Sequence, residues 1–296
     1  MSWTFVSTAA IAAASSNAPA LAYKPLDWTT AASGRITRAL YDGCRLQLIR
    51  IFESQVHPIR VAQSAAMASV APPKPAYRPH LPANLIVENS LFDAQLESII
   101  FAGEAHSEYL AESWMADAIR PRRGWFPGDG TGAGKAGQVA GILIDNSLKG
   151  RCRALWVSKS EKPIEYAQRD CSALGQDRLL ITPLSRFRQG MPITLEQGVP
   201  FTTDATLRSD AREKRVSRIR QIADWLGCDF DGVIVFDESH AMQNAAGGKS
   251  ERGDQAPSQQ GRAGLRLQHA LSDGLTILGA LIERCLLVRI VERPAA

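Results

Sequence analysis

Short apolar segments alternate with amphipathic segments along the second half of the chain. The apolar segments are residues 154–157, 179–181, 199–202 and 233–236. The amphipathic segments at 164–174 and 212–226 carry apolar residues at helical spacing. Buried strands that alternate with helices are typical of βαβ units, in which the strands run parallel. The pattern therefore predicts an α/β fold with a mostly parallel sheet flanked by helices.

Two further helices are predicted before this region. Apolar residues recur at helical spacing over 91–100 and over 138–148. Gly150 follows the second segment, where a glycine commonly ends a helix. Between the two helices, Trp125 and Phe126 form a strand-like approach to a glycine-rich segment. The order helix, strand, glycine-rich segment, helix is the context that a phosphate-binding loop requires.

The last part of the chain is less regular. Residues 244–264 are rich in Gly, Gln, Ser and charged residues without an apolar period, which predicts a mobile loop. A short helix is expected at 265–271. The strongly apolar residues 275–291 fit a helix or a strand, and periodicity does not decide between them.

Composition shifts divide the chain into four parts. Residues 1–70 form an N-terminal extension with weak helical patterning, best seen over 36–52. Residues 71–84 hold five prolines, which favour an extended linker because proline fixes φ and lacks an amide donor. We expect the main lobe at 85–272 and an atypical apolar tail at 273–296.

Overall composition excludes some classes of protein. With 45% hydrophobic and 22% charged residues, the chain is neither disordered nor a membrane protein, and a net charge of +4 does not by itself indicate nucleic-acid binding. The apolar residues 5–14 imitate a secretory signal but lack its basic start. No segment reaches the roughly 20 apolar residues of a membrane span, so no membrane partner is expected. The five cysteines include no C-x-x-C pair, which favours free thiols in the cytoplasm.

The glycine-rich segment has the chemistry of a phosphate-binding loop. Glycines let backbone amides converge on phosphate oxygens, and the following helix points its positive end at them. Lys135 would reach the β- and γ-phosphates, but Ala136 replaces the Ser or Thr whose hydroxyl normally binds Mg²⁺. The alternative is a glycine turn without a ligand. The candidate nucleotide contacts are Gly130, Thr131, Gly132, Ala133, Gly134, Lys135 and Ala136.

Two carboxylates follow the apolar segment 233–236. They would lie at the carboxyl end of a buried strand, which is where open α/β sheets bind ligands. Asp237 would hold Mg²⁺, directly or through water, and Glu238 would act as general base on the attacking water. His240 would lie at the edge of the site, where it could couple nucleotide state to another event. The alternative is a solvated turn or helix start.

The ordered motifs resemble the bacterial members of the strawberry notch family of helicase-like NTP hydrolases. The similarity extends over about residues 72–271, and its motifs are GDGTGAGK, GQVAGILIDN, ALWVSKS, PLSRFRQG, FTTDATLRSDAR, DFDGVIVFDESHAM and APSQQGRAGLRLQHAL. This resemblance implies a P-loop NTPase fold, the first RecA-like lobe of a DEAD/DEAH-type helicase, with ATP and Mg²⁺ as cofactors. Gln95 inherits the role of reading the adenine.

The resemblance also implies a nucleic-acid partner, DNA more than RNA. Four residues occupy positions at which helicase lobes touch a nucleic-acid backbone, with helix packing or plain surface charge as the alternative: Ser158, Lys159, Thr206 and Arg208. After Leu271 no strand ending in Ser-Ala-Thr is recognisable. The second RecA-like lobe, which supplies arginine fingers, is expected to be missing or supplied in trans.

Three functions remain open at this point. The first is an ATP-binding and ATP-hydrolysing lobe that acts on nucleic acid and is incomplete without a second lobe. The second is a truncated, non-catalytic remnant that at most binds nucleotide. The third, a P-loop kinase or transferase, is less favoured because Asp237 and Glu238 suit water activation better than transfer to an acceptor. We expect the isolated chain to bind ATP weakly and to hydrolyse it slowly or not at all.

Overall fold

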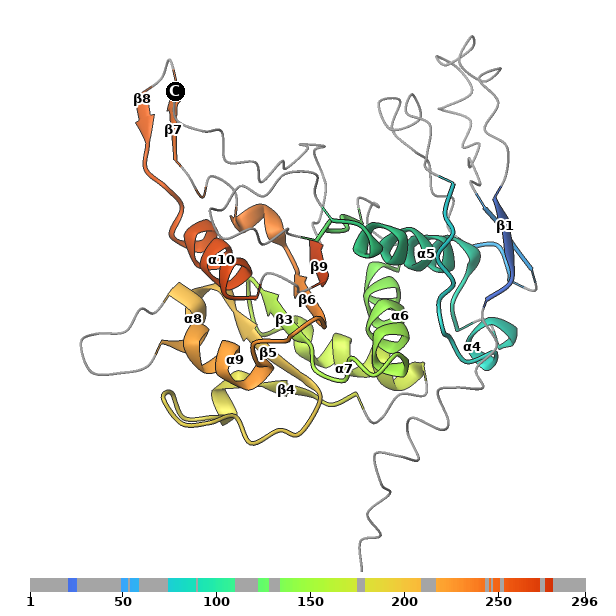
Figure 1. The fold of residues 1–296 in the computed structure, drawn as a ribbon, viewed down its shortest axis with the longest axis horizontal. Coiled ribbons are helices and arrows are strands. Elements are labelled where there is room, and N and C mark those ends of the chain that lie inside the picture. The colour runs from blue at the N-terminus through green and yellow to red at the C-terminus, as the bar shows by residue number, and fades with distance from the viewer. Residues whose placement is uncertain are drawn as a thin grey trace, which may run out of the picture. The chain divides into compact units, whose positions relative to one another are not determined.

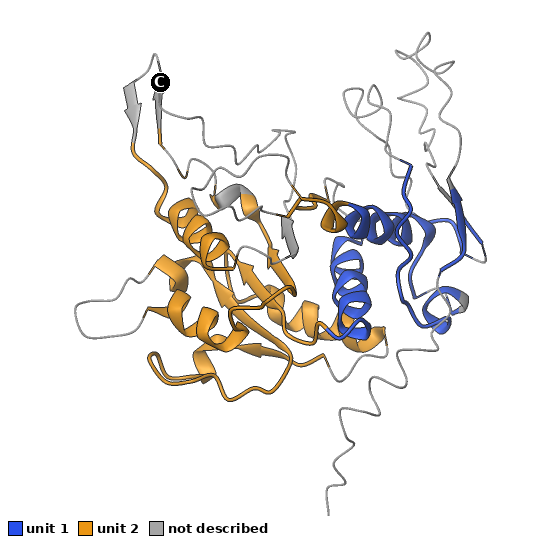
Figure 2. Cartoon of the chain, in the orientation of Figure 1, with its two compact units in different colours: residues 1–104, 129–150 blue, residues 105–128, 151–296 orange. Residues whose placement is uncertain are grey.

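A computed structural model describes most of the central part of the chain. The described residues are 21–25, 49–52, 54–58, 74–88, 90–109, 122–127, 134–174, 179–208, 217–242, 245, 247–250, 253–271 and 275–278. The chain divides into two compact units (Figure 2): Met1–Glu104 with Asp129–Gly150, and Ala105–Gly128 with Arg151–Ala296. Within the described residues, no helix has the length and apolar character that a membrane span needs.

The second unit is built on a parallel sheet. Its described strands lie in the order β4-β5-β3-β6-β9, and every neighbouring pair is parallel. Their bounds are Leu155–Ser158 for β3, Ile181–Pro183 for β4, Val199–Thr203 for β5, Val233–Phe236 for β6 and Leu275–Leu278 for β9. The predicted α/β fold with a mostly parallel sheet is confirmed.

Helices cover this sheet, and their apolar residues pack against it to form the core. They are α7 (Pro163–Ala173), α8 (Asp204–Arg208), α9 (Arg218–Leu226) and α10 (Gln259–Ala270), with short 3-10 turns at Leu184–Arg186 and Ser239–Met242. Figure 1 shows α8, α9 and α10 gathered on one side of the sheet. Val157 and Phe236, side by side in register, face this layer and pack in one buried cluster with Leu267 of α10. The core therefore lies between these strands and the layer of α8, α9 and α10.

The prediction of a mobile loop over 244–264 is wrong for the residues that the structure describes there. Strands β7 (Gly248–Ser250) and β8 (Gly253–Gln255) pair antiparallel, and α10 begins at Gln259. The short helix expected at 265–271 is the second half of α10, and its first turns were not predicted because their contact face is made of small residues. A Cβ added to Gly261 would lie 2.6 Å from the carbonyl oxygen of Met242. Close packing through glycine leaves no apolar period in the sequence.

The apolar tail contributes a strand. Leu275–Leu278 forms β9, which pairs with β6 from Val233↔Leu275 to Phe236↔Leu278. These residues therefore belong to the sheet, although their sequence lacks Ser-Ala-Thr. The rest of the tail, residues 279–296, lies outside the described residues.

The first unit contains two longer helices that pack against each other. α5 (Asp93–Ser107, grouped with the second unit from Ala105 on) and α6 (Lys135–Leu148) confirm the two predicted helices, and Gly150 adopts a positive φ of 91° just beyond α6. The two helices approach closely: a Cβ on Gly141 would lie 2.3 Å from Cδ1 of Ile99. A short helix α4 (Asn84–Val87) precedes them. The described residues 122–127 form no regular strand, although Arg122 pairs with Tyr109 in an isolated antiparallel bridge and Trp125 also takes part in a single bridge.

A small antiparallel pair replaces part of a predicted helix. β1 (Tyr23–Pro25) pairs with β2 (Ile49–Ile51), where helical patterning was expected over 36–52. Pairing with a distant strand overrides the weak local pattern, and β-branched Ile49 and Ile51 suit a strand. The rest of that predicted helix lies outside the described residues.

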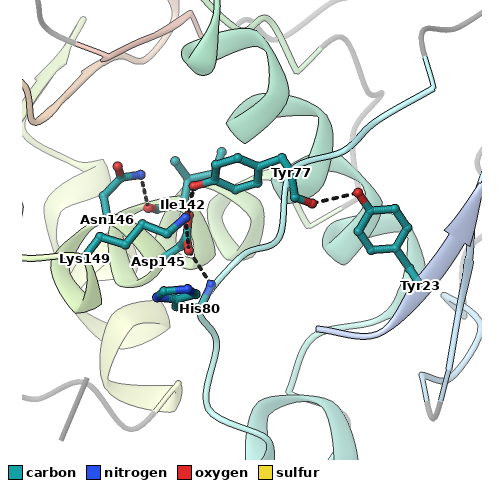
Figure 3. Close-up of polar contacts among 7 residues, drawn as sticks. All are labelled: Tyr23, Tyr77, His80, Ile142, Asp145, Asn146 and Lys149. Atoms are coloured by element: carbon teal, nitrogen blue, oxygen red, sulfur yellow. Dashed lines mark hydrogen bonds and ion pairs between the residues drawn. The ribbon is translucent and has the colours of Figure 1, made fainter. Parts of the chain in front are cut away.

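The proline-rich residues 74–82, which we call the strap, are extended and are held by hydrogen bonds to neighbouring helices (Figure 3). The Tyr77 amide donates to the Glu104 carboxylate of α5 at 2.7 Å, and the Tyr77 hydroxyl donates to Asp145 of α6. The His80 amide also donates to Asp145, at 2.6 Å. Lys149 forms an ion pair with Asp145 at 3.0 Å and donates to the Tyr77 hydroxyl. The strap therefore joins α5 to α6.

Candidate nucleotide and metal site

The predicted phosphate-binding loop ends at Gly134, the N-cap of α6. Gly134 has a φ of 69°, a left-handed conformation that favours glycine, and Lys135 is the first helical residue. Among the described residues no side chain caps this helix start, since its N-cap is a glycine, and its first turn holds no acidic residue. An uncapped, cationic helix start favours an anion such as a phosphate. The earlier loop residues Gly130, Thr131, Gly132 and Ala133 lie outside the described part of the chain.

Gln95 holds the end of this loop. Its Oε1 accepts a hydrogen bond from the Phe92 amide at 2.9 Å, and its Nε2 donates to the Gly134 carbonyl at 3.1 Å. A Cβ on Gly134 or Gly137 would lie 2.4 Å or 2.6 Å from Nε2, so both glycines make room for this amide. Gln95 is 7% exposed. The structure thus gives Gln95 a positioning role, and its contact with adenine stays a prediction.

A second polar contact between α5 and α6 lies deeper. Ser98 donates to Oε1 of Gln138 at 3.0 Å, and both side chains are buried. This contact fixes the register between the helix that carries Gln95 and the helix that carries Lys135. Sequence reasoning did not find it, because Ser98 and Gln138 come together only through helix packing.

In the second unit, Asp237 directly follows β6. Its amide donates to the Val157 carbonyl at 2.7 Å, which extends the hydrogen bonding between β6 and β3 by one residue. Its Oδ2 accepts from the Ser158 hydroxyl at 3.1 Å. Asp237 therefore stands at the carboxyl end of a buried strand, as predicted, with one oxygen oriented by a neighbouring strand.

Glu238 has an unusual backbone. Among the described residues it is the non-glycine residue with a positive φ, at 55°. A left-handed conformation costs a non-glycine residue about 1–3 kcal/mol, and such strain is concentrated at functional sites. The positive φ turns the backbone away from the direction of the strand immediately after Asp237. It coincides with the residue expected to act as general base.

Three adjacent strands end in polar residues at the same edge of the sheet. Ser158 of β3 is in register with Thr203 of β5, and Asp237 follows β6 on the other side of β3. The Thr203 and Thr206 hydroxyls lie 3.0 Å apart, and the Thr206 amide donates to the Thr203 hydroxyl at 3.2 Å, which caps α8. Thr203 was missed by sequence reasoning. The feature that could have revealed it is its position: Thr203 is a polar residue at the end of a predicted strand, as Ser158 is.

The predicted nucleic-acid contacts differ in exposure. Lys159 and Arg208 are exposed, and Thr206 is half-buried with its hydroxyl beside Thr203. Ser158 is 1% exposed and donates to Asp237, so its burial leaves no surface for the predicted phosphate contact. His240 lies in the 3-10 turn Ser239–Met242, and its side chain is outside the described part of the structure.

A sequence profile of the family described as "P-loop containing NTP hydrolase pore-1" matches residues 56–277. The chain belongs to this family. It is 35% identical to Protein strawberry notch of Drosophila melanogaster over 223 residues, which is 73% of this chain and 13% of that protein. It is 34% identical to human Protein strawberry notch homolog 1 over 222 residues, 73% of this chain and 15% of that protein.

A third relative is mouse Protein strawberry notch homolog 2, 39% identical over 196 residues, which is 65% of this chain and 14% of that protein. The strawberry notch resemblance predicted from the motifs is confirmed. The chain spans 13–15% of the length of these three relatives.

A P-loop NTP hydrolase binds a nucleotide, typically with Mg²⁺, and the described residues fit both groups. The uncapped start of α6 with Lys135 fits a polyphosphate. Asp237 fits Mg²⁺, which proteins commonly bind through one or two carboxylates and several waters. No cluster of three or more metal-binding side chains occurs among the residues described. The loop belongs to the first unit and the carboxylates to the second.

Proposed function

We propose that the chain is the first RecA-like lobe of a DEAD/DEAH-type, helicase-like ATPase that acts on nucleic acid, DNA more than RNA. The observation that carries the proposal is the Asp237 carboxylate, oriented by Ser158 at the end of β6 and followed by the strained Glu238. This arrangement occurs in a chain that belongs to a P-loop NTP hydrolase family.

Each site residue has a distinct role in the proposed hydrolysis. Lys135 and the amides at the start of α6 bind the β- and γ-phosphates of ATP, and Gln95 keeps the loop end in place. Asp237 is the protein ligand for Mg²⁺, which when bound neutralises charge on the phosphate oxygens. Glu238 accepts a proton from the attacking water. His240, two residues further on, couples the nucleotide state to nucleic-acid binding.

The nucleic acid is proposed to contact the surface near the strand ends. Lys159 follows β3 and Arg208 ends α8, and both are exposed. Cationic side chains in such positions contact backbone phosphates without reading sequence, and their contribution weakens as salt concentration rises. Thr206 lies on the same helix as Arg208 and completes this surface.

Efficient turnover is proposed to need a second RecA-like lobe supplied in trans. An arginine finger from such a lobe stabilises the transferring phosphoryl group and contributes about 10³- to 10⁵-fold in rate. Among the described residues, Cys152, Cys171 and Cys228 are free thiols, which supports a reducing compartment such as the cytoplasm as the place of action.

The test measures ATP binding and turnover by the purified chain with Mg²⁺, with and without single-stranded DNA or RNA. We expect weak binding that Lys135→Ala abolishes, and slow turnover that Glu238→Gln removes while binding is kept. Lys162→Ala, at an exposed lysine, is the matched control and should bind like wild type. Binding without any turnover would favour a non-catalytic remnant. Absence of binding that depends on Lys135 would refute the proposal.

A further inference from the structure

A glutamine that reads adenine uses both polar atoms of its amide group. Oε1 accepts a hydrogen bond from the N6 amine and Nε2 donates to N7, whereas guanine presents acceptors at both of these places. A good paired contact of this kind discriminates between bases by about 5- to 150-fold. The family resemblance implies this role for Gln95, so the contacts of its amide group bear directly on which nucleotides the site accepts.

Both polar atoms of the Gln95 amide group already have backbone partners within the first unit. Oε1 accepts from the Phe92 amide at 2.9 Å, and Nε2 donates to the Gly134 carbonyl at 3.1 Å. Gln95 is the third residue of α5 and Phe92 directly precedes this helix, so the first contact is that of a capping box. The second contact joins α5 to the N-cap of α6. The side chain therefore serves the starts of two helices.

These partners fix the orientation of the Gln95 amide group. Turning the group over would set its NH₂ against the Phe92 N–H and its oxygen against the Gly134 carbonyl, and both contacts would become repulsive. Gly134 and Gly137 make room for the group, because a Cβ there would lie 2.4 Å or 2.6 Å from Nε2. The side chain is also buried. A base that took this amide group would have to displace it from both backbone partners.

We propose that Gln95 is a positioning residue for the predicted phosphate-binding loop and does not select the base, so that the site takes ATP and GTP alike. The substrate class is nucleoside triphosphates, recognised through their phosphates by Lys135 and the amides at the start of α6. Gln95 acts on these groups through the Gly134 carbonyl, which directly precedes Lys135. This inference rests on the proposed function, because it names the substrates of the same site.

The experiment measures the affinities of the purified chain for ATP, GTP and inorganic tripolyphosphate, by competition against a fluorescent ATP analogue. The wild-type affinities for ATP and GTP should agree within about threefold, which is less than a paired adenine contact would give. Gln95→Ala should weaken the binding of all three ligands by one common factor of about 2- to 10-fold, the effect of losing one neutral hydrogen bond. Tripolyphosphate has no base, so its loss of affinity reports the loop alone.

Two further variants serve as controls. Gln55→Ala is the matched control, since Gln55 is an exposed glutamine of the same unit, and it should leave all three affinities unchanged. Gly141→Ala separates loss of stability from loss of loop position. Its Cβ would crowd Cδ1 of Ile99 at 2.3 Å rather than the Gln95 amide group, so it should lower stability and keep the three affinities.

Three outcomes would count against the inference. A wild-type preference of about tenfold or more for ATP over GTP, or a loss in Gln95→Ala confined to ATP, would overturn it while leaving the proposed function intact. Equal losses of affinity in Gln95→Ala and Gly141→Ala would overturn the positioning role in the same way. Absence of Lys135-dependent binding of all three ligands would overturn both the inference and the proposed function.

Discussion

Replacing Gly103 by alanine should dislodge Tyr77 from its position between α5 and the end of α6. A Cβ on Gly103 would lie 2.0 Å from Cε1 of Tyr77, closer than two carbon atoms can approach. The ring cannot turn aside freely, because its hydroxyl is bonded to Asp145 and Lys149 and its amide to Glu104. The strap must therefore shift, or these contacts must break.

The expected cost follows from three contributions. Overpacking of a tight contact costs about 1–3 kcal/mol. Loss of the Tyr77 hydroxyl at Asp145, a carboxylate whose side chain is 2% exposed, removes a hydrogen bond to a charged group worth about 1.5–3 kcal/mol. Alanine gains about 1 kcal/mol over glycine in a helix interior, which acts in the opposite direction. The net loss in the free energy of unfolding should be about 2–4 kcal/mol.

Urea unfolding followed by far-ultraviolet circular dichroism measures this loss. In a Tyr77→Ala background the ring is absent, so Gly103→Ala should instead stabilise by about 1 kcal/mol through helix propensity. Gly264→Ala in α10 is the matched control, because its Cβ would lie 3.2 Å from the flexible Met242 sulfur and in ordinary contact with Phe236, 3.9 Å from Cε1. That change should be close to neutral. A neutral or stabilising Gly103→Ala in the wild-type background would refute the role assigned to the strap.

Three further predictions concern the loop, a thiol and the general base. Gly137→Ala should weaken ATP binding several-fold, as measured by titration. The added Cβ would lie 2.6 Å from Nε2 of Gln95 and push this amide away from the Gly134 carbonyl. Burial raises the pKa of Cys171 to about 12, so at pH 8 a thiol reagent should label exposed Cys228 and spare Cys171 until the protein unfolds. Because its pKa is raised, the Cys171 thiol keeps its proton in the folded protein over a pH range in which the unfolded chain loses it. Its contribution to the free energy of unfolding should therefore be complete below about pH 9 and fall as the pH rises toward 12. Glu238→Asn should raise the free energy of unfolding by up to about 1 kcal/mol while abolishing turnover, because asparagine tolerates a positive φ.

Controls separate these effects from general damage. Gly141→Ala also crowds α5, but against the apolar end of Ile99, so it should lower stability without a specific loss of ATP affinity. Glu238→Gln keeps the strain and should abolish turnover without raising stability. Equal ATP affinities for the Gly137 and Gly141 variants would contradict the role of Gln95. Equal stabilities for the Asn and Gln variants would contradict the strain at Glu238.

The sheet and the two chemical motifs could be predicted because their signals are contiguous in sequence. Strand β6 is a run of apolar residues that ends in Asp237 and Glu238, and α6 follows a glycine-rich loop at Lys135. The motif residues needed no knowledge of distant contacts. Local pattern was sufficient to place them on their elements.

The supporting contacts could not be predicted, because they depend on register and on packing between distant segments. Ser158 meets Asp237 only through the pairing of β3 with β6. Tyr77 meets Asp145 only because a proline-rich segment packs across two helices. The first turns of α10, before residue 265, could not be predicted because Gly261 packs by its lack of a side chain.

The proposed function requires that the loop at Lys135 and the carboxylates at Asp237 and Glu238 act on one ATP–metal complex. Iron-mediated cleavage tests it most directly: Fe²⁺ replaces Mg²⁺ in the presence of ATP, ascorbate and peroxide, and the cut positions are mapped by mass spectrometry. We expect ATP-dependent cuts both beside Asp237 and at the start of α6, and we expect both to be lost in Lys135→Ala. Cuts at one of these places without the other, or cuts independent of ATP, would contradict it.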